Sequence, residues 1–84
     1  MKSYKELGNH IAKLISAENI WGTSIHTEKK ALSILKNNGW KEESVVEWNN
    51  GCFGGCHKLT HADEAFHVEL NSKDNKTYFC IALG

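Results

Sequence analysis

Hydrophobic residues near the start of the chain recur at steps of three and four, which is the spacing of an amphipathic helix. The pattern predicts a helix over residues 3–18. Ser3 can cap its first turn, and Glu6, three residues later, can complete a capping box. The residues that form the apolar stripe are Tyr4, Leu7, Ile11, Leu14 and Ile15.

A second stripe follows after a connector that contains Gly22. Thr27 is a suitable N-cap for this second helix. Gly39 fits the left-handed position that follows a helix end, and Trp40 stands where a Schellman motif places its hydrophobic residue, against Leu35. The apolar stripe consists of Ala31, Leu32, Ile34 and Leu35.

Beyond Gly39 the hydrophobic period changes to two, which predicts β-strands. Asn50-Gly51 is the strongest short signal for a hairpin turn, and Gly54-Gly55 suggests a bulge or loop. Residues 72–75 predict a second turn. The predicted strands are Ser44–Trp48, an uneven strand from Cys52 to Thr60, Ala65–Asn71 and Lys76–Leu83.

The predicted fold is therefore α+β, with two N-terminal helices packed on one face of a four-stranded antiparallel sheet in the order α-α-β-β-β-β. Alternation predicts an open outer sheet face that carries His67, Glu69, Tyr78 and Cys80. Lys76–Leu83 would be an edge strand, which could pair with a second copy to form a homodimer. The inward positions are Phe66, Val68, Leu70, Phe79, Ile81 and Leu83.

Length and charge limit the classes of function. The 84 residues predict a single domain over 1–84. Ten lysines balance ten acidic residues and there is no arginine, so the chain lacks the basic character expected of a nucleic-acid binder. Charges interrupt the first fourteen residues and no long apolar run exists, so neither a signal peptide nor a membrane span is expected. Three cysteines, an odd number, favour a reducing, cytoplasmic location.

Cysteines and histidines gather between residues 52 and 67. A structural zinc site would use Cys52, Cys56, His61 and His67, although the spacing of the two cysteines is wider than in most zinc knuckles. The competing interpretation makes both cysteines small packing residues, and we expect no metal. A thiol nucleophile formed by Cys56 and His57 would require a loop, because neighbours in a strand face opposite ways. No phosphate-binding glycine loop is present, and no cofactor is expected.

The outer face also suggests acid–base chemistry. His67 and Glu69 alternate on one strand, with Tyr78 opposite, and such groups can cleave RNA without a metal. In architecture the predicted fold resembles small bacterial ribonuclease toxins of the barnase and RelE kind. That resemblance implies a metal-independent ribonuclease, in which Lys58 alone would have to stabilise the phosphorane.

The leading hypothesis is a protein-binding module without chemistry of its own. Three tryptophans (Trp21, Trp40 and Trp48) are too many to bury fully in so small a domain, and exposed aromatic residues are typical of protein interfaces. In size and style the chain resembles inhibitors made by phages and mobile elements, such as toxin-immunity and anti-CRISPR proteins. The expected partner is a toxin, a nuclease or a defence complex. The expected binding residues are Trp48, Asn50, Phe53, His57, His61, His67, Glu69 and Tyr78.

Overall fold

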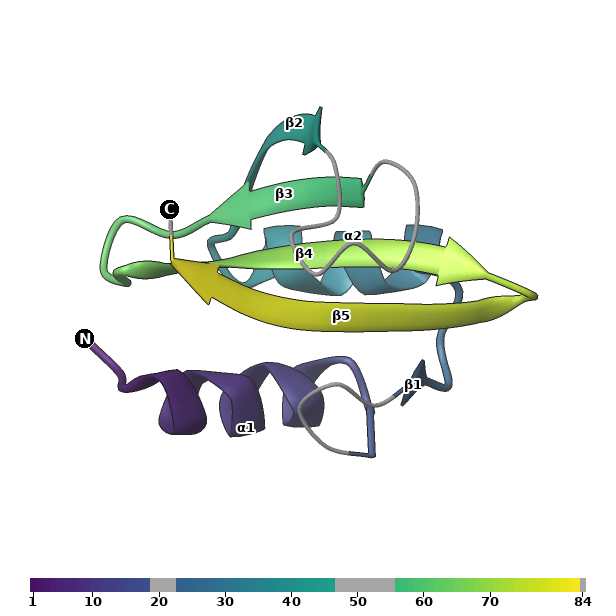
Figure 1. Ribbon diagram of the computed structural model, residues 1–84, viewed down its shortest axis with the longest axis horizontal. Coiled ribbons are helices and arrows are strands. Elements are labelled where there is room, and N and C mark those ends of the chain that lie inside the picture. The colour runs from purple at the N-terminus through teal and green to yellow at the C-terminus, as the bar shows by residue number, and fades with distance from the viewer. Residues whose placement is uncertain (19–22, 47–55, 84) are drawn as a thin grey trace.

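The computed structural model describes residues 1–18, 23–46 and 56–83, and they form an α+β fold (Figure 1). The helices are α1 (Tyr4–Leu14) and α2 (Glu28–Asn37). The strands are β1 (Thr23–Ser24), β2 (Lys41–Val46), β3 (Cys56–Thr60), β4 (Phe66–Lys73) and β5 (Lys76–Leu83). They form one antiparallel sheet in the order β1-β5-β4-β3-β2, so the described sheet has five strands and not the four predicted.

Both predicted helix caps are confirmed. Ser3 and Glu6 form the reciprocal capping box, with Glu6 N–H donating to Ser3 Oγ at 3.2 Å and Ser3 N–H donating to Glu6 Oε1 at 3.0 Å. Thr27 caps α2 by accepting a hydrogen bond from Lys30 N–H at 3.2 Å. Local side-chain chemistry therefore sets where each helix begins.

The end of α2 is the predicted Schellman motif. Trp40 N–H donates to Leu35 O at 3.0 Å, and Gly39 N–H donates to Lys36 O at 3.1 Å. Gly39 has a φ of 91°, a value that favours glycine because a Cβ would be strained there. Trp40 then enters the hydrophobic core together with Leu35.

The first helix ends four residues earlier than predicted. It ends at Leu14, and Ser16 takes a left-handed φ of 55° that turns the chain back. Ala17 forms a β-bridge with Ser24, whose hydroxyl donates to Ile15 O. Tertiary pairing near β1 thus replaces the last predicted turn of helix.

The core lies between the two helices and one face of the sheet. As predicted, the sheet contributes Val68 and Leu70 from β4 and Phe79 and Ile81 from β5, all buried. The prediction that the Leu83 side chain points into the core is wrong, because Leu83 is 71% exposed. The helices contribute Leu7, Ile11, Ala12, Ala31 and Leu35.

Two further corrections concern strands. The strand predicted over Ser44–Trp48 begins earlier, at Lys41, and β3 is described from Cys56 onward. The strand predicted as an edge, Lys76–Leu83, pairs with β1 at Thr77 and Tyr78, so it is not an edge there. The predicted turns at Asn50-Gly51 and Gly54-Gly55, and the side chains of Trp21 and Trp48, lie outside the described residues.

Candidate functional site

The outer sheet face predicted to be open is closed at its centre. His67 is 4% exposed and Glu69 is fully buried. His67 Nε2 lies 2.6 Å from Glu69 Oε2, so each polar side chain has a hydrogen-bonding partner away from water. The prediction that these two residues form an exposed working surface is therefore wrong. Strict alternation implied one wet face, but β4 is a central strand whose five residues from His67 to Asn71 are all buried.

Other residues on the same face also point away from solvent. Cys80 pairs with Glu69 across the strands, is fully buried, and places Sγ 4.0 Å from Glu69 Oε1. Cys80 is therefore a packing residue and not part of an exposed face. Tyr78, opposite Asn71, is half-buried. The face therefore contains the predicted set of side chains, but its central members are out of reach of a partner.

His57 lies on the helix side of the sheet, in a network of charged groups. Its Nδ1 is hydrogen-bonded to a carboxylate oxygen of Glu42 on β2, and its Nε2 lies 3.1 Å from Glu28 Oε1 at the start of α2. Lys36 Nζ lies 2.9 Å from the other Glu42 oxygen. Hydrogen bonds from Lys36 and then from His57 hold the pKa of Glu42 below its usual value. The network joins α2 to the β2–β3 pair, which gives His57 a structural role.

His61 occupies a different place, at the end of β3. Its ring lies beside Trp40, with centroids 5.2 Å apart and planes tilted by 59°. A Cβ on Gly39 would come within 2.9 Å of His61 Nε2, so the missing side chain of Gly39 leaves room for the imidazole. His61 Nδ1 accepts a hydrogen bond from Asp63 N–H at 3.1 Å. The end of α2 and the turn after β3 are thereby packed together.

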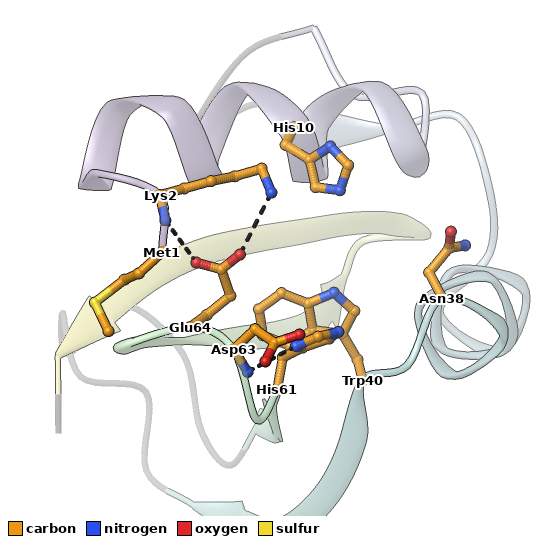
Figure 2. A pocket seen from close by; sticks show the side chains of 8 residues that line it. All are labelled: Met1, Lys2, His10, Asn38, Trp40, His61, Asp63 and Glu64. Carbon is orange, nitrogen blue, oxygen red and sulfur yellow. Dashed lines mark hydrogen bonds and ion pairs between the residues drawn. The ribbon is translucent and has the colours of Figure 1, made fainter.

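A polar pocket of about 250 Å³ opens beside His61 (Figure 2). Figure 2 shows that its walls come from the residues before α1, from His10 on α1, from the end of α2 and from the turn between β3 and β4. Glu64 anchors one side, accepting hydrogen bonds from Lys2 N–H at 2.9 Å and from Lys2 Nζ at 3.4 Å. The first of these bonds is the main cause that lowers the pKa of Glu64. The lining residues are Met1, Lys2, His10, Asn38, Trp40, His61, Asp63 and Glu64.

Of the predicted binding residues that the structure describes, only His61 lines this pocket. His10, Asp63 and Glu64 carry no local sequence signal, because contacts across about sixty residues, such as Lys2 with Glu64, assemble the site. Trp40 was predicted at the end of the second helix and counted among the three tryptophans, but it was not among the expected binding residues. Trp48, Asn50 and Phe53 lie outside the described residues.

The candidate zinc ligands whose side chains the structure describes do not lie close together. His61 lies beside Trp40 on the helix side, whereas His67 is buried on the opposite face with Glu69. Cys52 and the side chain of Cys56 lie outside the described part of the chain, so the thiol pairing of Cys56 with His57 is outside it too. Within residues 1–18, 23–46 and 56–83, no three His, Cys, Asp or Glu side chains are grouped so as to hold a metal ion.

None of the described helices is both long enough and apolar enough to cross a bilayer. Comparison of the chain with protein-family models, with curated proteins and with solved structures found no match.

Proposed function

We propose that this chain is a small binding module that blocks a partner protein by direct contact. The contact surface we assign is the end of the molecule where the pocket opens, and not the sheet face favoured by the sequence. Figure 1 places both termini and the β3–β4 connection at this end. The single observation that carries the proposal is that an exposed apolar patch adjoins the polar pocket there.

The patch, called the terminal patch below, consists of Met1, Tyr4, Phe66 and Leu83. Tyr4 and Phe66 pack edge to face with ring centroids 5.6 Å apart, and Phe66 pairs with Leu83 across β4 and β5. Tyr4 is 38% exposed, Leu83 71% and Met1 89%. Met1 also lines the pocket, so the patch and the pocket are continuous.

An apolar area next to convergent polar groups is the usual composition of a protein interface. The apolar side chains supply contact area, and the polar groups around them fix orientation and specificity. Ile25, 82% exposed, is the remaining large exposed hydrophobic residue in the described chain. It directly follows β1, which Figure 1 shows at the other end of the sheet. An isolated residue of that kind is ordinary for a protein surface, whereas three close together are not.

The ribonuclease alternative is weakened because two of the residues on which it was based, His67 and Glu69, are buried. A general acid or base must come within hydrogen-bonding distance of the reacting group. His67 and Glu69 are 4% and 0% exposed, so the pair as it stands cannot touch an RNA backbone. The balance of ten lysines with ten acidic residues, without arginine, also supports a protein partner over a nucleic acid. We keep a toxin, a nuclease or a defence complex as the expected class of partner.

Leu83→Glu is the direct test, because this side chain is exposed and its replacement should not disturb the core. The bait carries its affinity tag in the Asp74–Asn75 turn between β4 and β5, away from the terminal patch (Figure 1). We expect the wild type to capture a stoichiometric partner from the native host and to inhibit that partner's activity. Leu83→Glu should lose both properties.

Ile25→Glu is the matched control, since it places the same charge at an exposed aliphatic site at the other end. It should capture and inhibit as the wild type does. Equal loss in both variants, or a captured protein whose activity the chain leaves unchanged, would refute the proposed surface or the blocking role respectively. Thermal unfolding of each variant checks that the fold is retained.

A further inference from the structure

The pocket has a set of polar groups that the fold itself does not use. Lys2 is occupied by Glu64, and Asn38 Nδ2 donates to Ile34 O at 2.8 Å. Among the described residues, nothing pairs with the carboxylate of Asp63, with either ring nitrogen of His10 or with Oδ1 of Asn38. These groups line one cavity from three different elements (Figure 2).

The unused groups are mainly hydrogen-bond acceptors. The Asp63 carboxylate accepts only, Asn38 Oδ1 accepts, and a neutral His10 offers one acceptor nitrogen. His61 Nδ1 is already occupied by Asp63 N–H, and His61 Nε2 faces Gly39. The matching ligand group is one that only donates and carries positive charge. Arginine and lysine side chains are the two protein groups of this kind.

Size and shape favour the guanidinium. A pocket of about 250 Å³ is smaller than the roughly 300–1,000 Å³ of sites that hold whole small molecules, so it suits a single side chain. Aromatic rings of Trp40 and His61 line it, and a planar guanidinium packs on such rings better than an ammonium does. The Asp63 carboxylate can accept two parallel hydrogen bonds from the N–H groups of the guanidinium.

We propose that this pocket binds an arginine side chain of the partner protein, with Asp63 as its carboxylate anchor and His10 and Asn38 as further acceptors. The inference rests on the proposed function, because it names what the pocket recognises within the contact surface. The proposed arginine site also agrees with the distribution of charged groups around the pocket. Lys2 and the N-terminal amine lie near Glu64, where both lower the pKa of Glu64. In the described part of the chain, no cationic side chain forms an ion pair with Asp63.

The test uses N-acetyl-arginine amide as the probe and NMR titration of the isotopically labelled chain. At pH 7.5 we expect saturable shifts at Asp63, His10 and Asn38, with a dissociation constant on the order of 1 mM for so small a ligand. Asp63→Asn should weaken binding by about 10-fold or more, since a charge-assisted pair is lost. The citrulline analogue, which has the same shape without the charge, should give no saturable shift.

Asp74→Asn is the matched control, because the chain has only these two aspartates and Asp74 is exposed in the β4–β5 turn. It should leave the arginine titration unchanged. The proposal is overturned if Asp63→Asn binds the probe as the wild type does, or if inorganic phosphate and not the arginine probe saturates the same resonances. Because the probe needs no partner, this result is independent of the Leu83→Glu capture experiment. A chain that captures and blocks its partner through Leu83 but ignores arginine would keep the proposed function and lose only this assignment.

Discussion

His67 and Glu69, two residues apart on β4, are joined by a hydrogen bond of 2.6 Å beneath the surface of the sheet. Side chains at this spacing share one face of a strand, so a histidine and a carboxylate placed there can satisfy each other when that face is buried. The pair is therefore best understood as an internal polar contact, and its measurable consequence is on stability.

Replacing Glu69 by alanine should lower the free energy of unfolding by about 2–4 kcal/mol, because it leaves His67 without this partner and opens a cavity. Glu69→Gln keeps the shape and should cost less. Glu43→Ala is the control, since Glu43 is exposed and should change stability by no more than about 0.5 kcal/mol. Urea unfolding measures all three. Equal effects at positions 69 and 43 would contradict the buried pair.

Gly39→Ala should destabilise the chain through two separate effects. A left-handed backbone at a residue with a Cβ costs about 1–2 kcal/mol, and the new Cβ would also press on His61 Nε2. We expect the cost to fall when His61 is first replaced by alanine, because only the backbone strain then remains. A double-mutant cycle by urea unfolding gives the coupling, which we expect to be about 0.5 kcal/mol or more. Strict additivity would show that His61 does not pack on Gly39.

Glu42 should make stability depend on pH in the acidic range. Its pKa is lower in the folded chain than its ordinary value of 4.5, because Lys36 and then His57 hydrogen-bond the carboxylate. The stabilisation is therefore present above pH 4.5 and is lost as the pH falls through the lower, folded-state pKa. Both partners are partly exposed, so we expect less than about 1 kcal/mol.

The measurement for Glu42 is the urea midpoint of the wild type and of Glu42→Gln between pH 7 and pH 2.5. The two curves should differ most at the upper end and converge at the lower end. Glu43→Gln, one residue along the same strand, should follow the wild type more closely. A difference that stays constant down to pH 2.5 would contradict the assigned contacts.

Thr27→Ala should cost about 1 kcal/mol, since α2 would lose the acceptor for Lys30 N–H. Ser33→Ala, an exposed substitution inside the same helix, should be neutral or slightly stabilising because alanine has the higher helix propensity. Thermal unfolding of the pair separates loss of the cap from a general effect of removing a hydroxyl. Equal shifts for both variants would argue against the cap.

The features predicted correctly are those that depend on neighbouring residues. Ser3 with Glu6, Thr27, and Gly39 with Trp40 each act within a few positions, so the sequence is sufficient to place them. The α+β class and the helix-side core of the sheet follow in the same way from the period of the hydrophobic residues.

The features that were missed depend on tertiary contacts. β1 is only two residues long, too short to show alternation, and it exists because Thr23 and Ser24 pair with β5. The charged start of β2, from Lys41 to Glu43, does not resemble a strand in sequence. It is tolerated because β2 is at the edge of the described sheet.

For the same reason, the candidate site could not have been predicted from the sequence. The pocket joins the first two residues of the chain to a turn about sixty positions later, and no local pattern signals that approach. Alternation correctly placed His67 and Glu69 on the face opposite the core. It could not say whether that face would be covered.

The central position of β4 has a consequence for the dynamics of the chain. Its backbone is bonded to β3 on one side and to β5 on the other, and its side chains from His67 to Asn71 are shielded on both faces. Val68, Glu69 and Leu70 are the residues of β4 paired with both neighbours, so we expect exchange of the amides of this segment with deuterated solvent to require unfolding of the whole domain. β4 is thus where the global stability of the molecule can be measured, one amide at a time.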